Sequence, residues 1–333
     1  MVVGMRVLRL LLALLALLTL TVGQAAERVR LAMSPWAAWT PALGGEAQGL
    51  WRAQGIDVEV TVMSDDDQVR RALAEGRTEL SLAMIGNHVG GIIAGQDLVI
   101  LGETDWSHGG DKVVLRRGVK PADLRGATVG IYLDQPSVRF FLQRALQAYG
   151  LDDHAVRIAE VVDTAALADA FVNGTYPLVV DFDPEALRAL REGDGRVLAT
   201  SATFPGVIPE GFAMRRGALT AEVLERFFRG WFAAVRWSRD PANWSAYAAL
   251  MRAKAFTART TEADLLTMVA AVRIHEPGRA LSENAAGGGL DGYLKEVAEY
   301  LRAGGTLPAT WDAQRVVDTT AFRRAAQAEA VLP

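Results

Sequence analysis

Short apolar runs alternate with amphipathic stretches along the first part of this chain, and this alternation constrains the fold more than any other feature. Runs rich in β-branched and apolar residues predict strands, and the stretches between them have the period of helices. Strands that alternate with helices form right-handed crossovers on a mostly parallel sheet, so an α/β fold is predicted. The first set comprises strands at Val29–Met33, Val58–Met63, Leu80–Ala83 and Leu98–Gly102, with helices at Ala42–Gln54, Asp65–Glu75 and Asn87–Ala94.

The same alternation occurs a second time further along the chain. A weak internal repeat supports the duplication, because Arg71–Ala83 parallels Asp169–Asp181. A chain of 333 residues also exceeds what one hydrophobic core usually supports, so we expect two similar α/β lobes. The second set comprises strands at Ala127–Ile131, Ala155–Val162 and Leu178–Val180, with helices at Pro136–Tyr149, Thr164–Val172 and Pro184–Arg191.

After Gly211 the pattern changes to long helical segments, which we expect to pack on the first lobe. Phe212–Met214 is predicted to be a strand that returns to the first sheet. The first lobe is therefore discontinuous, with residues 26–117 and 211–333 in lobe one and residues 118–210 in lobe two. The predicted helices are Ala221–Arg239, Ala242–Lys254, Glu262–Arg273, Leu290–Arg302 and Asp312–Ala325.

The two crossovers between the lobes are predicted near Asp111–Gly118 and Thr203–Gly211. Within the second, Phe204–Pro209 has a proline near each end and a central glycine, which is a composition typical of a hinge. A plain loop has the same composition, so both interpretations stay open.

The N-terminus predicts export. Arg6 and Arg9 stand at the start of an apolar run that extends to Val22, and Gly23 and Ala25 occupy the positions that a signal peptidase reads. The run is shorter than a membrane-spanning helix requires, so we expect a signal peptide at residues 1–25. A retained signal anchor is the alternative.

Cysteine content and charge exclude several kinds of site, membrane anchor and partner. The chain has no Cys, which excludes disulfides, a thiolate metal site and a lipid-modified cysteine anchor, so we expect a protein that diffuses freely in the periplasm. Without residues 1–25, which hold two Arg and no acid, 33 basic and 39 acidic side chains remain and the formal charge is −6. Nucleic acid is therefore not an expected partner.

Several segments carry a resemblance to a known family, and they are Trp36–Pro41, Gly49–Val60, Ser107–Val114, Pro121–Gly130, Asp183–Pro184 and Trp311–Asp318. In order and spacing they resemble the substrate-binding proteins of nitrate, sulfonate, taurine and thiamine-pyrimidine importers, the SsuA/THI5-like and NMT1 group. The resemblance implies a two-lobed periplasmic-binding-protein fold of the venus-flytrap type (type II), with a small-molecule ligand between the lobes. It also implies a monomer without a cofactor, whose partner is the permease of an ABC importer.

The candidate binding site follows from the topology, because ligands of open α/β sheets bind beyond the carboxyl ends of the strands. The loops at those ends carry many acids and no Lys or Arg, so we expect a cationic or neutral nitrogen-containing ligand. Tryptophans on these loops could hold a cation over an indole face or stack on a heterocycle. The candidate ligand-binding residues are Trp36, Trp39, Ser64, Asp65, Asp66, Asn87, Asp105, Trp106, Asp134, Ser137, Asp181 and Asp183.

Structural roles for these acids stay open. Ser64 and Asp67 have the spacing of a capping box, and acids in a first turn stabilise a helix. Asp183 before Pro184 is also an ordinary N-cap with proline at N1. A sulfonate or taurine binder of the same family is the alternative function.

Catalysis and metal binding are not expected. The four histidines lie far apart without an i,i+4 pair, and no nucleophile elbow, phosphate-binding loop or dinucleotide fingerprint occurs. Pyrimidine synthases of the same fold carry a cysteine-rich motif, which this chain lacks. We therefore predict no catalytic residue, no metal site and no enzymatic activity.

Overall fold

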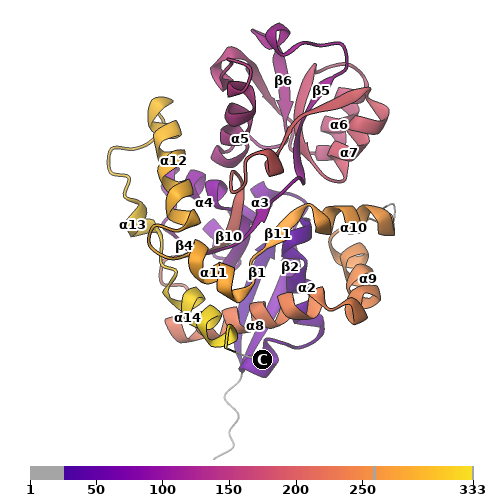
Figure 1. Ribbon diagram of the computed structural model, residues 1–333. Coiled ribbons are helices and arrows are strands. Elements are labelled where there is room, and N and C mark those ends of the chain that lie inside the picture. The colour runs from indigo at the N-terminus through magenta and orange to yellow at the C-terminus, as the bar shows by residue number, and fades with distance from the viewer. Residues whose placement is uncertain (1–25, 258–259, 332–333) are drawn as a thin grey trace, which may run out of the picture.

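The computed structural model describes residues 26–257 and 260–331, so the predicted signal peptide lies outside the described residues. The chain forms two α/β lobes, each built on its own sheet (Figure 1). Within the described residues, none of the helices combines the length and the apolar character needed to cross a membrane.

The sheet of lobe one has six strands in the order β11-β4-β10-β3-β1-β2. Strand β1 pairs in parallel with both β2 and β3, whereas β10 runs antiparallel between β3 and β4. The predicted return of the chain to this sheet is therefore confirmed. The strands are β1 (Glu27–Met33), β2 (Ile56–Val62), β3 (Leu80–Met84), β4 (Leu98–Ser107), β10 (Pro209–Arg215) and β11 (Val272–Ile274).

The sheet of lobe two has five strands in the order β7-β6-β8-β5-β9. Its strands are β5 (Asp111–Arg116), β6 (Thr128–Ile131), β7 (Arg157–Glu160), β8 (Leu178–Phe182) and β9 (Gly195–Thr200). The predicted end of the first segment of lobe one at residue 117 was wrong. Strand β5 lies in the sheet of lobe two, where it pairs antiparallel with β8 and β9. The chain thus crosses between lobes at residues 108–110, and it returns between Thr200 and Pro209.

Helices cover both sheets. Those before β10 are α2 (Pro41–Ala47), α3 (Asp66–Ala74), α4 (Ile85–Ile93), α5 (Pro136–Gln147), α6 (Thr164–Val172) and α7 (Glu185–Glu192). The C-terminal region adds α8 (Ala221–Arg239), α9 (Trp244–Lys254), α10 (Glu262–Ala270), α11 (Pro277–Glu283), α12 (Gly289–Ala303), α13 (Ala313–Val316) and α14 (Thr320–Glu329). Short 3-10 turns lie at Ala37–Trp39, Arg52–Gln54, Pro121–Leu124, Asp153–Ala155, Ser201–Thr203 and Pro241–Asn243.

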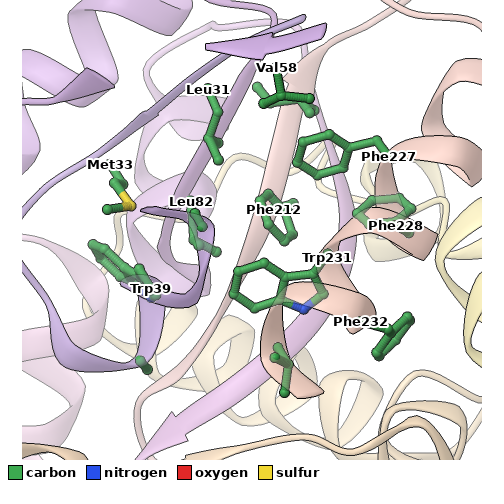
Figure 2. Packing of buried hydrophobic residues seen from close by; sticks show 14 of the residues in the cluster. Leu31, Met33, Trp39, Val58, Leu82, Phe212, Phe227, Phe228, Trp231 and Phe232 are labelled. Carbon is green, nitrogen blue, oxygen red and sulfur yellow. The ribbon is translucent and has the colours of Figure 1, made fainter. Parts of the chain in front are cut away.

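The core of lobe one lies between its sheet and α8 (Figure 2). Phe227, Phe228 and Trp231 of α8 pack on Phe212 of β10, with ring centroids 5.2–5.6 Å apart. Trp39 is buried at the edge of this same core, near Met33 and Leu82. Aromatic packing of this extent fixes α8 firmly against the sheet.

Helix α12 differs from the expectation that all C-terminal helices pack on lobe one. Its apolar face joins the core of lobe two, where Tyr293 and Tyr300 contact Phe140 of α5 at 6.1 and 5.7 Å between ring centroids. The Tyr300 hydroxyl also donates a hydrogen bond of 2.6 Å to Asp153. Figure 1 shows α12 standing beside both lobes. Helical periodicity identifies a buried face but not the lobe that buries it, which explains the error.

Candidate functional site

A small pocket lies where the two lobes meet, with a volume of about 20 Å³. Its walls come from strand ends and crossovers of both sheets, as the topology predicts for an α/β binding site. Lobe one supplies Ser34, Pro35, Trp36, Trp39, Asp66, Met84 and Glu210, and lobe two supplies Asp111, Tyr132 and Phe182.

Aromatic rings form one side of this interlobe pocket. Trp36 meets Phe182 edge to face with ring centroids 5.6 Å apart, and Tyr132 meets Phe182 in the same way at 4.9 Å. Gly110 makes this arrangement possible, because a Cβ atom at that position would overlap the indole ring of Trp36. Trp36 is only 6% exposed, so its ring belongs to the closed interior of the cleft.

Carboxylates form the other side. Asp66 accepts a hydrogen bond of 2.6 Å from the Ser34 hydroxyl, and Asp111 accepts one of 2.7 Å from the Tyr132 hydroxyl. Burial raises the pKa of Asp66 to about 6, with a smaller contribution from the charges of Asp65 and Asp111. Burial likewise raises the pKa of Asp111 to about 6. Both groups are therefore mostly ionised at pH 7 but close to their titration range.

Glu210 completes the acidic side with a pKa that is held well above its usual range. Burial is the main cause of this raised pKa, and the second is the charge of the neighbouring carboxyl of Asp105. The two residues face each other because β10 and β4 pair them in register. Two neighbouring buried carboxyl groups disfavour each other's ionisation, so the pKa values of both Glu210 and Asp105 are raised.

The pocket lining includes no Lys, Arg or His, and the charge of Lys112, which lies outside the lining, offsets only part of the effect of burial on the pKa of Asp111. The nearby Lys112 is already paired, since its Nζ lies 2.6 Å from both carboxylate oxygens of Asp183 and 2.6 Å from the carbonyl oxygen of Gly109. The pocket therefore combines an excess of acidic groups with aromatic walls. Within the part of the chain that the structure describes, no three His, Cys, Asp or Glu side chains gather in a way that could hold a metal ion.

The structure brings three of the predicted ligand residues to the pocket, namely Trp36, Trp39 and Asp66. Asp105 does not line the pocket but lies opposite Glu210 on the neighbouring strand β4, and the Thr104 hydroxyl donates a hydrogen bond of 2.7 Å to it. Ser64 and Asp65 line an outer chamber of about 580 Å³ that shares Asp66 with the pocket. Asp65 also caps α3 by accepting a 2.8 Å hydrogen bond from the Gln68 amide. The predicted capping box of Ser64 and Asp67 was therefore wrong, because the helix begins one residue later than that spacing requires and the Ser64 hydroxyl donates to Asp65.

Trp106 does not join the other two tryptophans, which corrects the prediction that all three could wall one pocket. It lies on β4 rather than on a loop, and alternate side chains of a strand point to opposite faces, so Trp106 points away from Asp105. Its indole Nε1 donates to Glu103 at 2.5 Å, and the guanidinium of Arg279 lies over its ring at 4.3 Å. This tryptophan lines a separate cavity of about 460 Å³ beside the crossover residues 203–207.

The remaining predicted residues lie elsewhere in or near the cleft. Asn87 and Asp134 line a groove that borders Asp66, and Ser137 is buried against Gly86 and Tyr293. Asp181 is buried in β8, and burial raises its pKa well above the usual range. Asp183 forms an ion pair with Lys112 and does not cap α7, whose N-cap is Pro184.

The candidate residues chosen from the sequence did not include Asp111 and Glu210. Both lie at the crossovers between the lobes, which the sequence interpretation treated as connections rather than as pocket walls. Ser34 and Phe182 belong to predicted strand-end loops, and Tyr132 immediately follows the predicted strand Ala127–Ile131. One sequence feature could have identified Asp111. It directly follows Gly109 and Gly110, where the chain passes from one sheet to the other.

Two α/β lobes joined by two crossovers, with a pocket enclosed between them, define a two-lobed binding-protein architecture. The model of the NMT1-like family matches residues 23–252, which is more than half of the chain. The chain therefore belongs to the NMT1-like family, and the predicted membership in the SsuA/NMT1 group of binding proteins is confirmed.

Solved structures confirm the predicted fold. The alkanesulfonate-binding protein SsuA from Xanthomonas axonopodis pv. citri has a TM-score of 0.71 at 16% identity, and the match covers 88% of this chain and 99% of that protein. A ligand-binding component of an ABC-type import system from Staphylococcus aureus has a TM-score of 0.70 at 12% identity, with 90% and 99% covered. The nitrate-binding protein NrtA from Synechocystis has a TM-score of 0.69 at 13% identity, with 92% and 90% covered.

A curated relative agrees with this placement. YtlA of Bacillus subtilis, for which a binding role has been suggested, is 25% identical over 182 residues. The match covers 51% of this chain and 53% of YtlA, so it spans about half the length of that relative.

Proposed function

We propose that this chain is the solute-binding component of an ABC-type importer and that it holds a small organic cation between its two lobes. The interlobe pocket has room only for the charged group, and the rest of the ligand extends into the adjoining spaces of the cleft, which share Asp66 with it. The composition of the interlobe pocket carries the proposal, because Asp66, Asp111 and Glu210 share it with four aromatic rings and no basic residue. Buried charge without a counter-charge is costly. A bound cation removes this cost, and its contact with an indole face stabilises the complex by about 0.5–2 kcal/mol more.

The relatives support a role in capture rather than catalysis. The solved structures of the same fold include binding proteins for alkanesulfonates and for nitrate and a binding component of an ABC-type import system. Some of these relatives are periplasmic, and the sequence of residues 1–25 predicts export, so we expect this protein in the periplasm. We further propose that it acts as a monomer whose closed form a permease recognises.

The nature of the ligand sets this protein apart from those relatives. Alkanesulfonate and nitrate are anions, and the carboxylates of this pocket would repel them. Ammonium, guanidinium and quaternary ammonium groups match the pocket in charge, and a neutral nitrogen compound that donates hydrogen bonds to the carboxylates matches it in part.

A thermal-shift panel on the mature chain tests this proposal at pH 7.5. It compares alkylammonium, arylammonium, guanidinium and quaternary ammonium compounds with alkanesulfonates, nitrate and ZnCl₂. A ligand at 100 times its Kd stabilises the folded state by about 2.7 kcal/mol, which is readily detected. We expect stabilisation by at least one organic cation and its loss in Asp111→Asn. Stabilisation by the anions alone would overturn the proposal.

A further inference from the structure

A groove of about 280 Å³ adjoins the interlobe pocket and has no role in the function proposed above. Helices α3 and α4 of lobe one form one wall, and the segment Leu133–Gln135 of lobe two forms the other. Asp66 lines both the groove and the pocket, and Leu133 lines both the groove and the outer chamber. The three spaces are therefore neighbouring parts of one cleft between the lobes.

The groove contains polar atoms without partners. Asn87 is only 8% exposed, and neither its amide Nδ2 nor its Oδ1 has a hydrogen-bond partner in the protein. The buried hydroxyl of Ser81 and the Oε1 atom of Gln96 also lack partners and line the same groove. Buried polar groups are nearly always hydrogen-bonded, and leaving one unpaired costs stability. These atoms are thus arranged to receive a polar group from outside the chain.

The charged side chains around the groove are already paired. Asp67 forms ion pairs with Arg70 and Arg71, and Asp134 lies 3.4 Å from the guanidinium of Arg139. Glu160 accepts a hydrogen bond of 2.8 Å from the backbone of Asp134. Apart from Asp66, which the groove shares with the pocket, the groove therefore offers hydrogen bonds rather than unpaired charge.

His88 is also uncharged. Its Nε2 lies 3.0 Å from the carbonyl oxygen of Gly211, and burial lowers its pKa to about 4. A neutral imidazole that donates to a carbonyl adds no charge to the groove. The unpaired amide of Asn87 is then the main feature that a ligand would meet there.

We propose that Asn87 forms a second subsite, which binds a neutral carboxamide-like group carried by the same cationic ligand. The inference rests on the proposed function, because Asp66 lines both spaces and a cation held at Asp66 leaves the groove within reach of the rest of the ligand. An amide or urea group donates and accepts hydrogen bonds at once, and so matches both polar atoms of the Asn87 side chain. Ser81 and Gln96 provide an additional hydroxyl and an additional acceptor.

Isothermal titration with two series of small amines tests the subsite. One series is glycinamide, β-alaninamide and 4-aminobutanamide, and the other is n-alkylamines of equal heavy-atom count. We expect at least one amide to bind about tenfold more tightly than its matched alkylamine, because pairing a buried amide is favourable by roughly this factor. Asn87→Ala should abolish the difference and leave the Kd of the alkylamine within about twofold.

Controls separate this outcome from loss of structure. Asn173→Ala, at an exposed helix end, should preserve the preference for the amide. Asn87→Leu should also abolish it without lowering the melting temperature, because the Asn87 amide has no partner to lose in the free protein. Equal binding of amides and alkylamines would overturn the subsite alone, and so would a preference that survives in Asn87→Ala. Failure of every amine to bind would overturn the subsite as proposed here, whereas the proposed function would be overturned only if no cation of the thermal-shift panel bound.

Discussion

The ring of Trp36 lies edge to face against the ring of Phe182, with centroids 5.6 Å apart, although the two residues belong to different lobes. A contact of this kind exists only when the lobes are closed on each other. The pocket between them is therefore completed by closure, and variants can be chosen that affect either the pocket or the closing surfaces.

Gly110→Ala should weaken cation binding by at least about tenfold. An added Cβ atom would overlap the indole of Trp36, and the ring would have to leave its place in the pocket wall. Loss of a desolvated cation–π contact is worth about 2 kcal/mol, which corresponds to a factor of more than ten. Titration calorimetry with the cation found in the thermal-shift panel measures the effect. Gly278→Ala, where no atom lies within 4 Å of the added Cβ, is the matched control.

Asp111→Asn should weaken binding and stabilise the free protein at the same time. At pH 8 the buried carboxylate, with a pKa of about 6, is ionised without an adequate counter-charge. The neutral amide removes this cost and should raise the free energy of unfolding by up to about 3 kcal/mol. Urea denaturation of the ligand-free protein at pH 8 checks this. A loss of stability would show that Asp111 has a structural role instead.

Cation affinity should fall as the pH is lowered below about 6. The pKa of Asp66 and that of Asp111 are both raised to about 6 in the empty pocket, and a bound cation favours the ionised forms. Protons are therefore released on binding, and the loss of affinity between pH 7 and pH 5 is about tenfold for one such group and about a hundredfold for two. Calorimetry across this pH range gives the slope of log Kd against pH, and Asp66→Asn should reduce this slope. A flat profile would contradict the assignment of both carboxylates to the site.

Gly86→Ala should hinder closure without altering the pocket. Gly86 on α4 lies so close to lobe two that an added Cβ would be 2.7 Å from the backbone nitrogen of Ser137 and 2.6 Å from the hydroxyl of Tyr293. We expect a weaker cation affinity and, in small-angle X-ray scattering, a larger radius of gyration than that of the wild type at saturating ligand. An unchanged radius would show that the two surfaces adjust to the methyl group.

Local patterns predicted much of this architecture. Helix α8 has the predicted bounds, Ala221–Arg239, because one long amphipathic segment determines its own limits. Strand β11 at Val272–Ile274 was assigned to the end of a helix, and β9 at Gly195–Thr200 was missed. Both are short strands that exist only through pairing with partners far away in the sequence, and no local pattern reports such pairing.

The candidate site likewise contains residues that local patterns predict and residues whose place depends on pairing with distant strands. Trp36 and Asp66 could be expected in the cleft because they follow strands whose carboxyl ends face it. Glu210 could not, because its place depends on the register of β10 against β4, which sets it opposite Asp105. The prediction for Trp106 failed for a related reason. Strand β4 is longer than predicted and includes Trp106, so the alternation of side chains along the strand determines where its ring points.

Identification of the captured molecule tests the central claim most directly. The mature protein would be incubated with a mixed small-molecule extract, washed, unfolded with acid, and the released compound identified by mass spectrometry. We predict that this compound carries a positively charged nitrogen group at pH 7 and is not retained by the double variant Asp66→Asn/Asp111→Asn. Release of a sulfonate, nitrate or other anion from the wild-type protein would contradict the account.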